Sequence, residues 1–302
     1  MSANTFRMRL PATSANLGSG FDTAAVALSF FLDIEASPAD EFSIDATGLD
    51  SEICSRVEKN LILETYARIL KQHGARVRSL RIKMRNEIPL GMGCGSSAAG
   101  RLAAVAMASH FGDLNWSGDR ILEEACALEG HPDNAAACWL GGFVAAATEG
   151  KSVRVARVEP PSEWRAIIVQ PAKSLATSAA RAVLPESYSS AEVITNLQSV
   201  SMLGLAFAQG RGDLLSTAMR DKIHQPYRSK ICPLLPRLLP LAGVGGILGV
   251  ALSGAGPAVL VIVDGEEGIE KACELIRSAA CDSPRLLVSR FQDSGARESS
   301  RG

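Results

Sequence analysis

The chain has 302 residues, a formal net charge of −1, and a composition of 47% hydrophobic and 21% charged residues. This length suggests one large domain or two of ordinary size. The balanced charge argues against a nucleic acid or an acidic membrane as partner, because binding to either requires a basic face. The seven cysteines form no CxxC pair, which favours reduced thiols in a cytoplasmic protein over a disulfide framework.

The first half of the chain alternates between strand-like and helix-like periodicity. Polar and apolar residues alternate in FRMRL (6–10), as expected for a strand, and Asn60 and Gly74 bracket a helix over 60–73 as its N-cap and stop. Serines stand where the N-cap of the helix at 96–111 belongs. The remaining elements predicted here are a strand at 80–85, a helix at 121–129 and a strand at 151–158.

Paired prolines mark the predicted domain boundary. Pro160 and Pro161 stand among polar residues, so we expect domains at 1–160 and 161–302. The second half is predicted to contain a strand at 164–170, mostly helix over 191–224, a helix at 266–280 and a strand at 285–291. The last eleven residues are polar, and we expect them to be frayed. Helices and strands mix without a strict βαβ rhythm, which predicts an α+β or mixed α/β fold in two domains.

One uncharged stretch is long enough to cross a bilayer. Between Arg237 and Asp264 lie 26 residues without a charge, but six of them are glycines and two are prolines. A buried strand, a glycine turn near residue 254 and a second buried strand fit this composition better than a membrane span.

The segment PLGMGCGSSAAG (89–100) is typical of a phosphate-binding loop. It follows a predicted strand and precedes a predicted helix, whose first N–H groups and dipole would attract an anion. A serine hydroxyl at this point could ligate Mg²⁺. No lysine follows the glycines, which excludes a Walker A loop. Taken alone, the segment is also consistent with a glycine loop packed tightly against an alanine-rich helix.

Two other segments narrow the interpretation. LPATSANLGSGFDTAAVAL (10–28) and ALSGAGPAVLVIV (251–263), together with the glycine-rich loop, resemble the three signature motifs of the GHMP kinases, in the same order. The resemblance implies ATP as phosphoryl donor and a two-domain GHMP kinase fold. Its N-terminal domain would be like ribosomal protein S5 domain 2 and its C-terminal domain ferredoxin-like, with the site in the cleft between them.

Further segments resemble the branch of this superfamily that phosphorylates L-homoserine. They are PATSANLGSGFD (11–22), EGHPDNAAACWLGG (129–142), LATSAARAVLP (175–185) and IHQPYR (223–228). Cys94 departs from the usual leucine and Ser19 from a common proline, but neither change removes a polar group. The resemblance implies transfer of a phosphoryl group from ATP to the hydroxyl of L-homoserine, giving O-phospho-L-homoserine, a step toward threonine.

The resemblance also implies roles for individual residues. Arg181 and Arg228 would bind the substrate carboxylate, which suits the planar guanidinium fork, and Asp22 would bind its ammonium. Asn16 would bond the substrate near its hydroxyl, and His131, Asn134 and Thr177 would line the same pocket. Mg²⁺ would lie between Ser97 and Glu129. The phosphate loop would comprise Pro89, Leu90, Gly91, Met92, Gly93, Cys94, Gly95, Ser96, Ser97, Ala98 and Ala99, and the C-terminal glycine loop Ser253, Gly254, Ala255 and Gly256.

Each assignment has a plainer alternative. Asp22 could cap a helix that begins at Thr23, and Ser97 could act solely as the N-cap of its helix, without binding a metal. Glu129 could be an ordinary carboxylate at a helix end. The two arginines could be solvated surface charges, and His131 a turn residue. No residue stands out as a general base.

Two rival functions remain open at this level. One is a GHMP kinase for mevalonate or a sugar, and the other is a non-catalytic ligand sensor on the same fold. Many relatives are dimers, which makes a homodimer an expectation as well.

Overall fold

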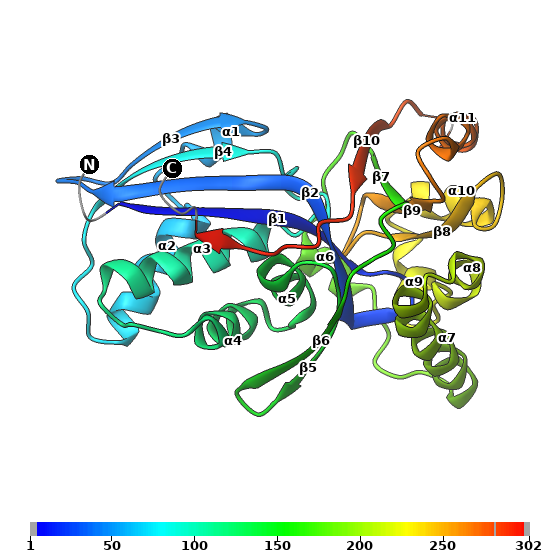
Figure 1. Ribbon diagram of the computed structural model, residues 1–302, viewed down its shortest axis with the longest axis horizontal. Helices are drawn as coiled ribbons and strands as arrows, with labels where there is room; N and C mark the ends of the chain where they lie inside the picture. Colours follow the sequence, from blue (N-terminus) through cyan, green and yellow to red (C-terminus); the bar gives the residue numbers. More distant parts are fainter. Residues whose placement is uncertain (1–4, 281, 299–302) are drawn as a thin grey trace.

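The computed structural model describes residues 5–280 and 282–298. The chain forms two β-sheets with helices packed on them, joined end to end (Figure 1). The first sheet contains β1 to β6 and β11, and the second contains β7 to β10. This mixture of helix and sheet confirms the α+β prediction. The domain boundary at 160/161 stays a prediction; β6 (Ser152–Val158) ends and β7 (Arg165–Gln170) begins on either side of it.

Two long antiparallel strands form the spine of the N-terminal sheet. β1 (Phe6–Asn16) pairs with β2 (Gly20–Pro38), and the order across the sheet is β11-β1-β2-β4-β3. β3 (Ser43–Gly48) and β4 (Leu80–Asn86) run parallel, separated along the chain by α1 (Ser51–Cys54) and α2 (Leu61–Gln72). β5 (Phe143–Glu149) pairs with the start of β2 and with β6.

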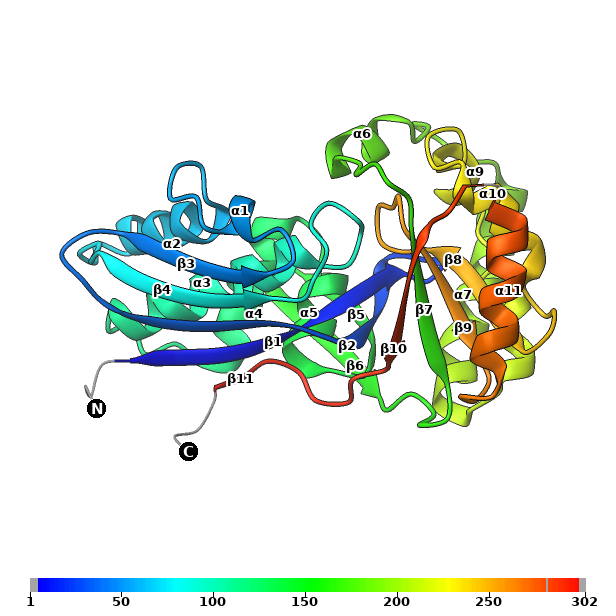
Figure 2. The ribbon, with the colours of Figure 1, turned by 90° about the horizontal axis from the view of Figure 1, so that it is seen from above.

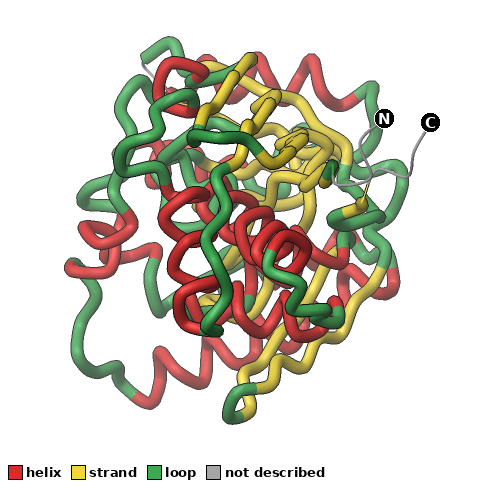
Figure 3. The backbone as a smooth tube through the Cα atoms, turned by 90° about the vertical axis from the view of Figure 1, so that its left-hand side faces the viewer, coloured by secondary structure: helices red, strands yellow, loops and turns green. Residues whose placement is uncertain are grey.

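The helices of the N-terminal half gather on one side of this sheet, which Figure 3 shows end-on. α3 (Ser96–Phe111) and α5 (Asp133–Leu140) contact β1, and α2 and α4 (Gly118–Glu129) pack against α3. α3 is almost entirely buried because its alanines and glycine allow close approach of its neighbours on every side. This central position fixes the N-terminus of α3.

The C-terminal sheet has the strand order β10-β7-β9-β8, with every pair antiparallel. Its remaining strands are β8 (Ile247–Leu252), β9 (Val259–Val263) and β10 (Arg285–Arg290). In chain order the four strands lie as 4-1-3-2, with helix α7 (Ser190–Gln209) before the second strand and α11 (Gly268–Ala280) before the fourth. This is the ferredoxin-like arrangement that the resemblance implied. The short helices are α6 (Thr177–Ala182), α8 (Leu215–Ala218), α9 (Gln225–Arg228) and α10 (Leu234–Leu238).

The turn between β1 and β2 reaches into the C-terminal half. The Ser19 hydroxyl donates to the carbonyl of Ala218 at 2.6 Å, and Gly254 N–H donates to the carbonyl of Ala15 at 3.0 Å. Gly18 has φ +81°, and a Cβ there would lie 1.9 Å from the Met219 carbonyl oxygen, so only glycine fits. The first motif is therefore held against the C-terminal half.

Most predicted elements are confirmed, with small shifts at their ends. α3 has the predicted bounds, and the Asn60 side chain caps α2 by accepting from Ile62 N–H at 3.0 Å. α4 begins three residues before the predicted 121, because Ser117 caps it. The uncharged stretch forms β8, a glycine turn and β9, as predicted. No helix within the described ranges is long and apolar enough to cross a membrane.

The region 191–224 is mostly helical, as predicted: α7 covers more than half of it, Gly210 in the left-handed region ends α7, and short helical turns continue to Ala218. Two expectations about local structure are wrong. The chain end is not frayed as far as Glu298, because β11 (Arg297–Glu298) pairs with β1; residues 299–302 lie outside the described residues. The helix that Asp22 might have capped does not exist, since residues 20–38 form β2.

Candidate active site

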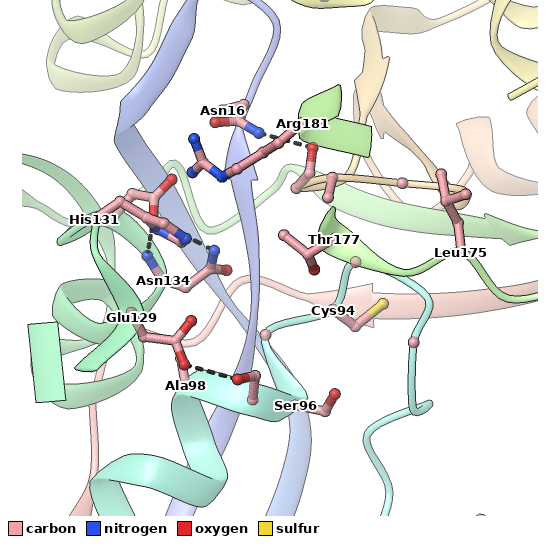
Figure 4. Close-up of a pocket in the computed structure, with 18 of the residues that line it drawn as sticks. Asn16, Cys94, Ser96, Ala98, Glu129, His131, Asn134, Leu175, Thr177 and Arg181 are labelled. Atoms are coloured by element: carbon pink, nitrogen blue, oxygen red, sulfur yellow. Dashed lines mark hydrogen bonds and ion pairs between the residues drawn. The ribbon is translucent and has the colours of Figure 1, made fainter. Parts of the chain in front are cut away.

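A pocket of about 550 Å³ lies where the phosphate loop, the first motif and the C-terminal glycine loop meet. Figure 4 shows His131, Asn134 and Glu129 on one side of it and Thr177 and Leu175 on the other. The predicted substrate and metal residues all line it: Asn16, Asp22, Ser97, Glu129, His131, Asn134, Thr177, Arg181 and Arg228. So do Gly91, Gly93, Cys94, Gly95, Ser96 and Ala98 of the phosphate loop, with Gly254, Ala255 and Gly256. Pro89, Leu90, Met92, Ala99 and Ser253 do not line the pocket.

The phosphate loop is packed so closely that two of its glycines are obligatory. Gly93 has φ +77°, and a Cβ on it would lie 2.0 Å from the Ser253 carbonyl oxygen. At Gly95, with φ +72°, a Cβ would lie 1.9 Å from Thr13 Oγ1. The Ser253 hydroxyl donates to the Gly93 carbonyl at 2.8 Å. Although Ser253 is outside the pocket, it thus links the two glycine loops.

α3 directs its N-terminus at the pocket. Gly95 is the N-cap in the left-handed conformation and offers no side-chain hydrogen bond, so the predicted serine cap is wrong. Ser96 and Ser97 instead occupy the first turn, where their N–H groups lack partners within the helix. The 16-residue helix places the positive end of its dipole at this point. The turn is suited to bind an anion.

Ser97 and Glu129 face each other across the predicted metal position. The Ser97 hydroxyl donates to Glu129 Oε1 at 2.8 Å, and Arg101 forms an ion pair with the same oxygen. The Glu129 side chain is 8% exposed. A hydroxyl and a buried carboxylate are hard oxygen donors of the kind Mg²⁺ binds, so the residues present fit this ion. The position of Arg101, one turn after Ser97, shows that Glu129 is more than an exposed carboxylate at a helix end.

Asp22 and Arg181 form a bidentate ion pair. Arg181 Nη1 and Nη2 donate to Asp22 Oδ2 and Oδ1 at 3.0 and 2.8 Å. Asp22 N–H donates to Asn16 Oδ1 at 3.0 Å, and Asn16 Nδ2 donates to the Gly254 carbonyl at 2.7 Å. The backbone of Asp22 is thus fixed by the first motif, while Arg181 lies on α6, which Figure 2 shows at the upper edge between the two halves. Arg181 and Asp22, which are predicted to bind the carboxylate and the ammonium of the substrate, therefore pair with each other in this structure.

Arg228 is a buried cation that lacks an ionic partner. It is 1% exposed, so the alternative of a solvated surface arginine is wrong. Its guanidinium donates to the carbonyls of Ala180 at 3.0 Å and Gly254 at 3.3 Å, and to His224 Nδ1 at 3.2 Å. All three acceptors are neutral, and among the described residues no carboxylate lies within ion-pair distance of it. Burial lowers the pKa of Arg228, and the neighbouring Arg181 charge adds to this.

His131 is held by a buried aspartate. His131 Nδ1 lies 2.6 Å from Asp133 Oδ1, and Asp133 is 1% exposed. The same oxygen accepts from Asn134 N–H at 2.7 Å, and Thr13 Oγ1 donates to Asn134 Oδ1 at 2.6 Å. The pKa of His131 is raised: burial opposes its charge, but Asp133 outweighs burial, with help from Asp22 and Glu129. Asp22 and Asp133, both close to His131, make this side of the pocket acidic.

A second, mostly apolar pocket of about 400 Å³ adjoins the phosphate loop. It shares Ser96 and Ser97 with the first pocket, and Asn60 and Cys54 also line it. Its apolar walls come from Leu32, Ile53, Leu61, Ile62, Met84, Ile88 and Leu90. The sequence alone gave no indication of this pocket, because its walls come from four separate segments.

Sequence reasoning missed several residues of the first pocket. Arg101 and Asp133 are the charged ones, and Leu128, Leu175 and Ala176 are apolar. Asp133 stands within a quoted motif, between His131 and Asn134, which was a usable signal. Arg101 offered none, since an arginine one turn into a helix is ordinarily a solvated residue.

Comparison with known families agrees with this geometry. The model for the GHMP kinases N terminal domain matches residues 60–142, and the model for the GHMP kinases C terminal domain matches 205–280. A solved mevalonate kinase from L. major, 14% identical, superposes with a TM-score of 0.71 over 98% of this chain and 97% of that one, which supports the fold. The chain therefore belongs to the GHMP kinases, enzymes that transfer a phosphoryl group from ATP.

Individual relatives identify the branch of the superfamily. The chain is 41% identical to the homoserine kinase of Solibacter usitatus, over 90% of this chain and 88% of that one. It is 35% identical to the homoserine kinase of Synechocystis, with 91% of each chain covered. A solved homoserine kinase from Cytophaga hutchinsonii has a TM-score of 0.83 at 25% identity over 98% of both chains. Within the GHMP kinases, the chain falls among the homoserine kinases.

Proposed function

We propose that this protein transfers the γ-phosphoryl group of ATP to the hydroxyl of L-homoserine, giving ADP and O-phospho-L-homoserine, a step in threonine biosynthesis. The single observation that carries the proposal is Arg228. A buried guanidinium bonded only to neutral acceptors is costly unless an anion reaches it. A small carboxylate entering the pocket would supply that anion.

The rest of the pocket suits the other end of an amino acid. Asp22 is fixed by Asn16, and Asp133 lies on the same acidic side, so an ammonium would find two carboxylates near it. A zwitterion would exchange the resting Asp22–Arg181 pair for two new ion pairs. Arg181 would join Arg228 at the substrate carboxylate, and Asp22 would bind the substrate ammonium. Mevalonate has no ammonium to pair with Asp22. A sugar has neither an ammonium nor a carboxylate, so it would pair with neither Asp22 nor the two arginines.

The phosphate groups of ATP would lie at the N-terminus of α3. N–H groups of the first helical turn and the closely packed glycines present backbone donors there, without any lysine. Ser97 and Glu129 would hold Mg²⁺, which supplies charge neutralisation for the bridging and γ-oxygens when bound. Phosphoryl transfer can proceed mainly by positioning and electrostatic stabilisation, so the reaction needs no dedicated general base for the hydroxyl proton.

The adenine would occupy the apolar pocket beside Ser96 and Ser97. An aromatic base fits apolar walls with a few polar groups, and this pocket opens next to the proposed phosphate site. Its walls include Cys54, which is the only half-buried cysteine among the six in the described ranges. The thiol therefore reports on occupancy of the pocket.

We expect Mg-ATP to slow alkylation of Cys54 by N-ethylmaleimide, while L-homoserine alone leaves the rate unchanged. Burial raises the pKa of Cys54, with Asp50 adding to the shift, so labelling should accelerate as pH rises beyond the usual thiol range. Mass spectrometry of the labelled peptide gives the rate, and Cys54→Ser is the control for labelling elsewhere. An equal rate with and without Mg-ATP would place the adenine elsewhere.

Two further expectations complete the proposal. The six described cysteines are unpaired, which supports a reducing compartment and hence the cytoplasm. A homodimer also stays a prediction. α7 leaves Ile194, Leu197 and Leu205 exposed, so any second copy has an apolar helix face available.

The proposal is tested by ADP release with Mg-ATP and a panel of acceptors. The panel contains L-homoserine, D-homoserine, L-serine, L-threonine, mevalonate and galactose, and the phosphorylated product is identified by ³¹P NMR. We expect a strong preference for L-homoserine. Activity on mevalonate or galactose alone would retain the kinase and overturn the substrate. ATP binding without any turnover would indicate a ligand sensor.

A further inference from the structure

His224 is completely buried beside the proposed carboxylate site, and both of its ring nitrogens are engaged. Nε2 lies 2.9 Å from the carbonyl oxygen of Gly18, and Nδ1 lies 3.2 Å from Arg228 Nη1. The imidazole also stacks on Phe21, with ring centroids 5.1 Å apart and planes 25° from parallel. His224 does not line the pocket, so it can influence a ligand only through its neighbours.

The partners fix the protonation state of this imidazole. A guanidinium can only donate, so Nδ1 must accept and carries no proton. A carbonyl can only accept, so Nε2 must carry the proton. The ring is therefore neutral and in a single tautomer, since protonating Nδ1 would place a hydrogen against the Arg228 cation.

Burial favours the same state and outweighs the nearby carboxylates. Burial lowers the pKa of His224 and the Arg228 charge lowers it further, while Asp221, Gly18 and Asp22 act in the opposite direction. Asp221 Oδ2 lies 3.5 Å from Nε2, but this oxygen already accepts from His224 N–H at 2.9 Å and Gln225 N–H at 2.6 Å. These two backbone hydrogen bonds hold Asp221 at the start of the short helix α9.

We propose that His224, as its Nε2-protonated neutral tautomer, is a positioning residue that orients the Arg228 guanidinium toward the substrate carboxylate. This inference rests on the proposed function, in which Arg228 binds that carboxylate. The lone pair of Nδ1 fixes one edge of the guanidinium, and the carbonyls of Ala180 and Gly254 fix the others. The remaining donors of Arg228 then face the pocket.

The same contacts couple the carboxylate site to the first motif. The guanidinium of Arg228 lies 5.3 Å from the centroid of the Phe21 ring, and that of Arg181 lies 5.6 Å from it. His224 stacks on the same ring. Through Nε2, His224 also holds Gly18, two residues from Asn16. One aromatic ring and one imidazole therefore align both arginines with the turn that fixes Asp22.

Two substitutions separate the bonds of this imidazole. In His224→Asn, the side-chain oxygen is attached to Cγ, as Nδ1 is, and can still accept from Arg228 while the bond to Gly18 is lost. In His224→Gln, the longer amide reaches the Nε2 position and can still donate to Gly18, while Arg228 loses its acceptor. Each variant loses one of the two hydrogen bonds, so their melting temperatures should fall by similar amounts.

We expect His224→Gln to raise the KM for L-homoserine about tenfold, the effect of losing one hydrogen bond to a charged group. His224→Asn should change that KM much less, and the KM for ATP should stay the same in both. Equal rises of the homoserine KM in the two variants, or a parallel rise for ATP, would reduce His224 to a purely structural residue and overturn the inference.

A measurement without turnover distinguishes this inference from the proposed function. The ¹⁵N resonances of the His224 side chain should report a protonated Nε2 and an unprotonated Nδ1 from about pH 5 to about pH 8, around the usual histidine pKa. A proton on Nδ1 contradicts the inference whatever the substrate is. If wild-type enzyme fails to phosphorylate homoserine while the tautomer is as stated, the proposed function fails instead.

Discussion

Replacing Arg228 with methionine is expected to raise the KM for L-homoserine by at least about 30-fold, with the KM for ATP unchanged. Truncating one partner of a desolvated, hydrogen-bonded charge pair costs about 2–5 kcal/mol of binding. Arg228 would form such a pair with the substrate carboxylate, because it is 1% exposed and its acceptors within the protein are all neutral. Methionine has similar length and no charge, and it can pack against Phe21. Steady-state kinetics with each substrate varied separately measure the effect.

Stability provides the control for the Arg228 variant. Removing a buried charge relieves a desolvation cost, while the Ala180 carbonyl and His224 Nδ1 lose the donor that Arg228 supplied; the Gly254 carbonyl still accepts from Asn16. These opposing effects should leave the melting temperature close to that of the wild type. Arg211→Met is the matched variant, since Arg211 is exposed and pairs only with Asp213 on the surface. A homoserine KM near the wild-type value in Arg228→Met would remove the carboxylate from this position.

The second large effect is expected at Glu129. Glu129→Gln keeps the size of the side chain but removes the charge that is proposed to bind Mg²⁺ beside Ser97. A metal that neutralises transferring phosphoryl oxygens contributes several kcal/mol, so kcat should fall about 100-fold or more and the Mg²⁺ requirement should rise. Initial rates over a Mg²⁺ titration at constant ATP measure both quantities.

Glu124→Gln is the control for Glu129, because Glu124 lies on the same helix α4 and pairs with Arg120 away from the site. This variant should retain wild-type kcat and Mg²⁺ dependence. Glu129→Gln also leaves Arg101 without its carboxylate, so a melting curve is needed beside the kinetics. If Glu129→Gln shows the wild-type Mg²⁺ dependence, Glu129 forms a structural ion pair with Arg101 and does not bind the metal.

The sequence allowed the pocket residues to be predicted better than their contacts. Asp22, Glu129 and Arg181 were selected because the segments around them match motifs, and the structure brings them into one pocket. The Asp22–Arg181 pair joins residues 159 positions apart, and nothing in the spacing of either residue indicates it. The neutral surroundings of Arg228 arise where three segments meet. The burial of its charge therefore could not be predicted from the sequence either.

Helices and strands with one buried face could be predicted, because their sequences show the expected periodicity. β4 alternates strictly between buried and exposed residues, and α2 is capped by Asn60, so both were predicted. β2 went unrecognised because much of its first half is buried on both faces, which removes the alternation. β11 was missed because its pairing with β1 comes from the tertiary fold, and polar residues at a chain end carry no signal for it.

Recognition of both charges of an amino acid is the central claim, and substrate analogues lacking one charge test it most directly. 4-Hydroxybutanoate keeps the hydroxyl and carboxylate of homoserine without the ammonium, and 3-aminopropan-1-ol keeps the hydroxyl and ammonium without the carboxylate. We predict that kcat/KM for each falls at least about 30-fold below that for L-homoserine, since each leaves a pocket charge unpaired. Turnover of 3-aminopropan-1-ol as fast as that of L-homoserine would contradict the role of Arg228 and the account built on it.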